Sequence, residues 1–227
     1  MKSTALTGLL TAAVLIPLTA GAQPRPGNPT TATVITKAEI DKIAATMQNV
    51  TTRDENARVV DIGDGWSMEL GIIHRAKQRV LTVGEARAQA ARGNAPAAAG
   101  RGNAQAAEQR APCGQQMANP PDDALQGAIT HDFQTEGYYI VSGGGTMFTD
   151  GYIVNGRHNP SPDLNGPTCG GQAVDVVKKT VKAGDIIIIP AGVVHGWVDI
   201  PEHVDYLSFR PSPGILTAGF VHPVLRK

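Results

Sequence analysis

From Gly127 to the C-terminus the sequence alternates short apolar runs with turn residues, and this pattern restricts the fold more than any other feature. The runs cover 138–142, 146–149, 174–177, 186–189, 193–198, 204–209 and 215–221. Short runs with no helical pattern between them are typical of strands in a sandwich or barrel. Strand patterns also begin near Ala57. The expected fold class is therefore all-β, with one domain over residues 57–227.

Residues 1–22 have the pattern of a secretory signal peptide of bacterial type. Lys2 gives a positive start, 6–18 is apolar, and Ala20-Gly21-Ala22 matches an A-x-A cleavage site. The apolar stretch is too short for an ordinary membrane-spanning helix, although a membrane anchor is the alternative interpretation. The sequence predicts a periplasmic or secreted protein that starts at Gln23 and has no membrane span after cleavage.

An N-terminal extension at 23–56 precedes the strands and is expected to contain one helix. Thr36 and Glu39 have the spacing of a capping box. An apolar stripe at helical spacing follows, made by Ile40, Ile43, Ala44 and Met47. We expect a short helix that ends near Asn49 and packs on the barrel or on another subunit.

Residues 85–112 are of low complexity and rich in Ala, Gln, Gly and Arg. Alanine favours a helix, but the glycines, the prolines and the missing apolar stripe favour a mobile surface insertion. Such an insertion either covers a site or is merely tolerated.

The charged residues balance, with 20 basic and 20 acidic side chains and no net formal charge. Nucleic acid and anionic membranes favour a basic excess, so neither is expected as the main partner.

The two cysteines, Cys113 and Cys169, lie in loops rich in Gly and Pro. An exported protein permits a disulfide, which we predict between them, with two free thiols as the alternative. Two cysteines alone make a poor zinc site.

The segment from Gly184 to Trp197 contains a run of isoleucines, Ile186 to Ile189, that ends at a proline. A continuous apolar run of this kind predicts a strand buried on both faces. Pro190-Ala191-Gly192 predicts a tight turn. Val193 to Trp197 then begin the next strand, with His195 either as a core residue or as a metal ligand.

Two half-motifs in this chain resemble those of the cupin superfamily. Gly184-x5-Pro190-x-Gly192-x2-His195 matches the second cupin motif, and His131-x4-Glu136-x6-Gly143 matches the later half of the first. The usual first histidine of that motif is Ile129 here. The wider pattern resembles small exported bacterial cupins. The resemblance implies a double-stranded β-helix, a jelly-roll barrel whose interior often holds a divalent metal.

His131, Glu136 and His195 are the metal ligands that the resemblance implies. Two imidazoles and one carboxylate suit Fe, Mn, Ni, Cu or Zn and leave positions open for water, oxygen or substrate. The alternative is that Ile129 marks a site that has lost its metal and is now a neutral polar pocket.

Further residues are candidates for roles around that site. Tyr138 shares strand parity with Glu136 and could handle a proton, whereas Tyr139 should face away. His74 could enter the barrel as a fourth ligand or a base, or be a satisfied core or rim residue. Trp197 could form an aromatic wall or have a packing role alone, and Arg210 could hold a substrate carboxylate or a salt bridge at the rim.

The first functional hypothesis is an exported metalloenzyme acting on a small organic molecule, with oxygenase chemistry slightly favoured over lyase or isomerase chemistry. The second is a non-catalytic cupin that binds a small ligand without a metal. Cupins often form homodimers, and a dimer would accompany either.

Overall fold

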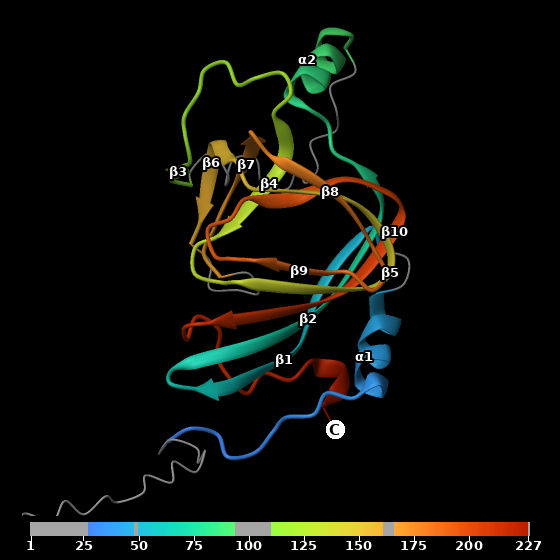
Figure 1. The fold of residues 1–227 in the computed structure, drawn as a ribbon, viewed down its shortest axis with the longest axis vertical. Coiled ribbons are helices and arrows are strands. Elements are labelled where there is room, and N and C mark those ends of the chain that lie inside the picture. The colour runs from blue at the N-terminus through green and yellow to red at the C-terminus, as the bar shows by residue number, and fades with distance from the viewer. Residues whose placement is uncertain (1–26, 48–49, 94–109, 161–165, 227) are drawn as a thin grey trace, which may run out of the picture.

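The computed structural model describes residues 27–47, 50–93, 110–160 and 166–226. The predicted signal peptide and most of the predicted insertion lie outside these ranges. The described strands form one antiparallel sheet that curls into a barrel (Figure 1). They are β1 (Thr52–Gly63), β2 (Trp66–Arg79), β3 (Pro112–Cys113), β4 (Leu125–His131), β5 (Glu136–Thr149), β6 (Tyr152–Asn159), β7 (Thr168–Val174), β8 (Val177–Lys182), β9 (Ile186–Ile189) and β10 (His195–Ser212).

Two long strands connect the layers of the barrel. β10 pairs with β2, with β5 and, at His195, with Ile129 of β4. β5 pairs with β9 through its first residues and with β8 through its last. The strand order β1-β2-β10-β4-β7-β6-β3 completes the sheet. All these pairs are antiparallel, and the architecture is the all-β, double-stranded β-helix that the motifs imply.

The N-terminal helix forms as its capping box predicts. α1 (Lys37–Ala44) starts after Thr36, whose side chain accepts from the backbone N–H of Glu39, and the Glu39 side chain accepts from the N–H of Thr36. A 3₁₀ turn, η1 (Ala45–Met47), continues it. Ile43 and Met47 bury themselves against Leu70 and Ile72, so α1 covers the outer face of β1 and β2. A second 3₁₀ turn, η3 (Pro223–Leu225), packs in the same cluster.

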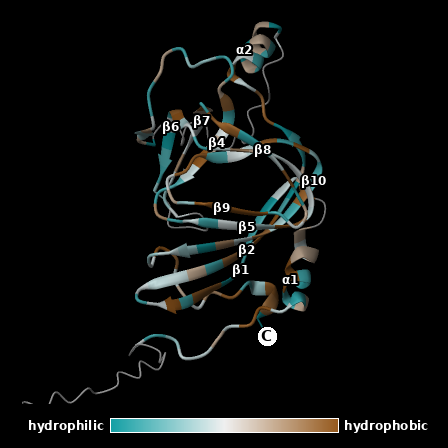
Figure 2. Ribbon diagram, in the orientation of Figure 1, coloured by the Kyte–Doolittle hydropathy of each residue, from teal (hydrophilic) through white to brown (hydrophobic). Residues whose placement is uncertain are grey.

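The isoleucine run is a strand, but it is not buried on both faces. β9 is hydrophobic along its length in Figure 2. Ile186 and Ile188 are nevertheless 70% and 71% exposed, while Ile189 is buried. β9 lies in an antiparallel sheet whose outer face it leaves to solvent, so alternate residues point outward. The prediction of a doubly buried strand is therefore wrong.

The start of the low-complexity region is helical rather than irregular. α2 (Val83–Ala91) begins at Thr82, which forms a capping box with Glu85. Val83 is the buried residue of this helix and packs near Ala124 and Val154. The N-cap and one buried residue stabilise the start of this alanine-rich helix. The capping box could have been recognised in the sequence, even though an apolar stripe is missing.

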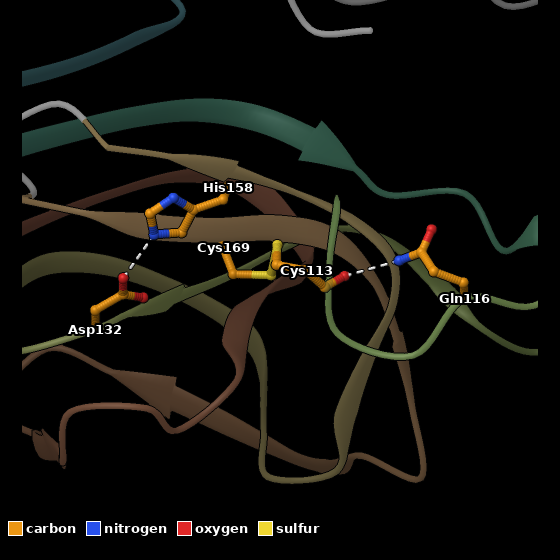
Figure 3. The surroundings of a disulfide bond; sticks show 5 residues. All are labelled: Cys113, Gln116, Asp132, His158 and Cys169. Atoms are coloured by element: carbon orange, nitrogen blue, oxygen red, sulfur yellow. Dashed lines mark hydrogen bonds and ion pairs between the residues drawn. A yellow bond between two sulfur atoms is a disulfide. The ribbon is translucent and has the colours of Figure 1, made fainter. Parts of the chain in front are cut away.

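The predicted disulfide is present. Cys113 and Cys169 are bonded across 56 residues, with their Cα atoms 6.0 Å apart. Figure 3 shows the bond beside His158, which contacts Asp132 at 2.8 Å from Nε2 to Oδ2, and beside Gln116, whose amide donates to the Cys113 carbonyl at 3.0 Å. It ties β3 to β7 at the side of the barrel.

No helix in the described part of the chain is long and apolar enough to span a membrane.

Candidate metal centre

Three strand ends bring the two half-motifs together. His131 ends β4, Glu136 opens β5 and His195 opens β10. The turn before β10 is fastened to β4 because the backbone N–H of Gly192 donates to the His131 carbonyl at 2.8 Å. Gly192 has φ +81°, which a side chain would strain. The Pro-Ala-Gly turn therefore sets where His195 enters the barrel.

The three side chains converge in the interior. Oε2 of Glu136 lies 3.3 Å from Nε2 of His131 and 3.1 Å from Nε2 of His195. The two imidazole rings stack with centroids 5.3 Å apart. All three residues are buried, and one ligand atom from each lies within 4.8 Å of the others. This is the group that the sequence predicted.

The orientation of His195 suits a metal ligand. Its Nδ1 lies 3.0 Å from the Val193 carbonyl, which can only accept, so Nδ1 carries the proton. Nε2 then faces the Glu136 carboxylate with a lone pair unless the ring takes a second proton. A lone pair and a carboxylate directed at each other are stabilised by a cation between them. The donor set thus fits a divalent metal.

Ile129 occupies the cavity wall beside this group, as its parity with His131 predicts. It pairs with His195 across β4 and β10 and lines the same cavity. A hydrocarbon side chain offers no ligand there, so the group contains three candidate ligands among the described residues.

Tyr138 contacts the group directly. Its hydroxyl donates to Oε2 of Glu136 at 2.5 Å. Burial and the neighbouring Glu136 charge raise the pKa of the Tyr138 hydroxyl well above its usual range. Burial alone would raise the pKa of the Glu136 carboxyl, but the two imidazoles, where they donate to it through Nε2, and the charge of Arg210 lower it well below its usual range. Glu136 is therefore ionised. Tyr139 points outward, as predicted.

Arg210 is neither a free substrate anchor nor a rim residue. It is 2% exposed, and its three nitrogens are all used by carboxylates. Nε donates to Glu136 at 2.6 Å, Nη1 to Glu69 at 2.9 Å and Nη2 to Asp54 at 2.7 Å. A buried guanidinium needs such partners because an unpaired buried charge is costly. Arg210 orients Glu136 by binding the carboxylate oxygen that the two histidines do not contact.

Glu69 belongs to the same buried network. It is fully buried, and its Oε2 has no hydrogen-bond partner among the described residues. Burial outweighs the Arg210 charge and raises the pKa of Glu69 to about 7. The sequence offered no local sign of this carboxylate.

His74 does not enter the barrel. It lies on the outer face of β2, where its Nδ1 contacts Oδ1 of Asp205 at 2.6 Å. It lines a different cavity, together with residues of α1 and η1. In a strand, neighbours point to opposite faces. Both neighbours of His74, Ile73 and Arg75, point inward instead. Sequence reasoning missed Arg75, although the alternation of β2 could have revealed it.

The metal-ligand group opens into a cavity of about 270 Å³. Trp197 lines it and packs against Tyr206, with ring centroids 6.0 Å apart, so it is both a wall and a core residue. Tyr206 also packs on Tyr138 at 4.6 Å between centroids. Asp54, Arg75 and Met147 also line the cavity.

No protein-family model matches the chain, and no curated protein matches it. Solved structures do match. One is an uncharacterized conserved protein with a double-stranded β-helix domain from Klebsiella pneumoniae, 16% identical over 74% of this chain and 79% of that chain, with a TM-score of 0.30. KdgF from Halomonas sp. is 11% identical over 67% of this chain and 85% of that chain, with a TM-score of 0.27.

A recombinant oxalate oxidase in complex with glycolate is 13% identical, over 74% of this chain and 54% of that chain, with a TM-score of 0.32. At these identities and scores the likeness carries nothing about activity. The strand pairing and the convergence of the two motifs are the deciding observations. This chain has the cupin fold. Both cupin half-motifs deliver their ligands to one interior site, with Ile129 as the departure.

Proposed function

We propose that this chain is an exported, metal-dependent cupin enzyme that acts on a small organic molecule, with oxygenase chemistry favoured over lyase or isomerase chemistry. One observation carries the proposal: His131, Glu136 and His195 converge, buried, at the edge of a cavity. The metal would be held by Nε2 of His131, a carboxylate oxygen of Glu136 and Nε2 of His195. Two histidines and one carboxylate are the ligand set of non-haem iron oxygenases, which is why that chemistry is favoured.

A bound divalent metal supplies Lewis acidity and open positions for oxygen or for a substrate oxygen. The protein's own side chains supply the rest. Arg210 keeps Glu136 ionised and oriented, since it donates to the oxygen that faces away from the histidines. The Tyr138 hydroxyl keeps its own proton and donates a hydrogen bond to Oε2 of Glu136, which places a proton at the edge of the site. Trp197 and Met147 add apolar surface to a wall that is otherwise rich in polar and charged side chains.

The alternative is a non-catalytic barrel that binds a small ligand without a metal. Ile129 favours it, because one usual ligand is missing. The four donors around Glu136 also favour it, because two protonated histidines would satisfy the carboxylate in place of a metal.

The test is elemental analysis of residues 23–227 purified without a histidine tag or chelator. We expect near-stoichiometric transition metal, and its loss in His195→Ala with the fold retained by circular dichroism. His203→Ala is the matched control, because His203 lies on the same strand but contacts Ser142 and Asp205 outside the barrel. Unchanged metal in His195→Ala would exclude that ligand. A protein that stays metal-free after incubation with Fe, Mn, Ni, Cu and Zn would favour the ligand-binding barrel.

Export is supported by the signal-peptide pattern at 1–22 and by the disulfide. We expect cell fractionation to find the full chain outside the cytoplasm and a variant without 1–22 inside it. Equal distribution of the two would contradict export through this segment.

A further inference from the structure

We propose that Arg75 binds a carboxylate group of the substrate, in the cavity that also holds His131, Glu136 and His195. This inference rests on the proposed function in one respect: it takes that cavity as the substrate site. It assigns the substrate class, a small carboxylic acid with an apolar body, and it transfers to Arg75 the role that the sequence suggested for Arg210.

The position of Arg75 follows from the alternation of β2. Ile73, two residues earlier, is buried in the barrel core with Tyr138 and Tyr206. Residues two apart share a face of a strand, so Arg75 points inward as well. It lines the same cavity as the three candidate ligands, and it is half-buried.

The guanidinium of Arg75 has unused donors. Its Nε donates to the Tyr206 hydroxyl at 3.0 Å. Its two terminal nitrogens make no hydrogen bond or ion pair with any residue in the described ranges. Arg210, by contrast, has all three nitrogens occupied by carboxylates. Arg75 is thus the lining arginine whose fork is open toward the cavity.

The Tyr206 hydroxyl lies beside the Arg75 guanidinium and adds a second kind of donor. Its oxygen accepts from Arg75, so its own proton remains to be donated, and no described residue takes it. The side chain is 2% exposed and lines the cavity. A planar guanidinium beside a hydroxyl donor matches the two oxygens of a carboxylate, which accepts paired hydrogen bonds from arginine.

The charges of the cavity also favour an anionic ligand. Its lining contains two cations, Arg75 and Arg210, and two anions, Asp54 and Glu136. Glu69 lies behind Arg210 and adds at most one more negative charge, because burial raises its pKa to about 7. A divalent metal on His131, Glu136 and His195 would leave the cavity with excess positive charge. A carboxylate ligand removes that excess, and buried charge without compensation is costly.

The size and walls of the cavity restrict the rest of the ligand. About 270 Å³ is roughly the volume of nine water molecules, at about 30 Å³ each. Tyr138, Trp197 and Met147 present aromatic and thioether surface. An acid with a small apolar body, such as a ring of six carbons, suits these walls.

The test is binding of acetate, lactate, succinate and benzoate, each compared with its amide, by isothermal titration calorimetry. We expect at least one acid to bind the metal-loaded wild type about tenfold or more tightly than its amide. Arg75→Gln should lose this preference and retain its metal. Arg79→Gln is the matched control, because Arg79 is exposed on the same strand and pairs with Glu85 at the surface.

Two variants protect the test against a folding defect in Arg75→Gln. Tyr206→Phe removes only the hydroxyl and should weaken acid binding severalfold, and Arg75→Lys should give an intermediate preference. Acid binding that is equal in the wild type and Arg75→Gln, or no acid binding at all, would overturn the inference. Metal content is measured on the same samples. Bound metal without acid preference defeats only this inference, whereas an Arg75-dependent preference in metal-free protein defeats only the proposed metalloenzyme.

Discussion

At the scale of single residues, Ile129 is where the interior departs from a four-ligand cupin site. It lies beside His195 in the pairing of β4 and β10 and faces the cavity. A histidine at this position would add an imidazole next to the two that are present. The isoleucine instead leaves the protein with three candidate ligands and more room for exogenous ones.

Ile129→His should therefore tighten divalent metal binding. We expect the dissociation constant to fall by at least about tenfold, or ~1.4 kcal/mol. Competition with a chromophoric chelator measures it. Thr130→His is the control, because Thr130 is the next residue on β4 and does not line the cavity. Equal affinities of the two variants would mean that position 129 does not stand in a ligand position.

Glu69 makes stability depend on pH in a defined direction. Its folded pKa of about 7 lies above the ordinary value of 4.5, so the folded state binds this proton more tightly. Between these two values the folded state carries more proton than the unfolded state, and the free energy of unfolding falls as the pH rises. Glu136, whose pKa is lowered, acts oppositely and loses its contribution as the pH falls below 4.5.

Glu69→Gln should remove the first effect and leave the second. We compare the free energy of unfolding of the variant with that of the wild type, and the difference (variant minus wild type) should rise between pH 4.5 and 7. The rise should be at most about 3 kcal/mol, since one pKa unit is about 1.36 kcal/mol. Denaturant unfolding at pH values across this window measures the difference. A difference that stays constant with pH would contradict the assignment of Glu69 as the group that titrates.

At the scale of elements, β5 shows how glycine can continue a strand rather than end it. Three consecutive glycines, Gly143 to Gly145, lie inside β5 rather than in a turn. Gly143 has φ +67°, and a Cβ there would lie 2.0 Å from the His203 carbonyl oxygen. The glycines let β5 bend while its first half pairs with β9 and its second with β8.

Gly143→Ala should be much more destabilising than Gly184→Ala. Both glycines have positive φ, but nothing lies within 4 Å of a Cβ at Gly184. We expect about 1–2 kcal/mol for Gly184→Ala from the backbone conformation alone. Gly143→Ala should cost on the order of 1–3 kcal/mol more from the clash with β10. Thermal and denaturant unfolding of the pair test this, and equal losses would refute the close approach.

At the scale of the whole molecule, remote segments create both the barrel and the site. His74 and Asp205, 131 residues apart, face each other across β2 and β10. The cross-link between Cys113 and Cys169 adds a covalent restraint over 56 residues. In a chain-entropy account, such a restraint stabilises the fold mainly by limiting the unfolded state.

Cys113→Ala combined with Cys169→Ala should lower the free energy of unfolding by about 4 kcal/mol. Wild-type protein in a reductant should show a similar loss, while the reductant should leave the double variant unchanged. Denaturant unfolding in both conditions compares them. A loss below about 1 kcal/mol would mean that the disulfide adds little to stability.

Local patterns in the sequence determined the strand-rich fold, the capped helix α1, the disulfide pair and the candidate ligand group of His131, Glu136 and His195. These features depend on short-range periodicity, on cap and turn residues, or on motifs with fixed spacing. They could be read without knowing which strands become neighbours. The same patterns misjudged β9, because only the position of a strand in the sheet decides how many of its faces are covered.

Only the tertiary structure decided which cavity arginine is paired with carboxylates and which keeps hydrogen-bond donors available to a ligand. Arg210 is occupied because Asp54 of β1, Glu69 of β2 and Glu136 of β5 meet around it. Arg75 feels the charge of Asp54, but it donates only to the Tyr206 hydroxyl among the described residues, so its terminal nitrogens stay open toward the cavity. The charge state and the reach of a side chain depend on partners from distant strands, and no local pattern encodes them.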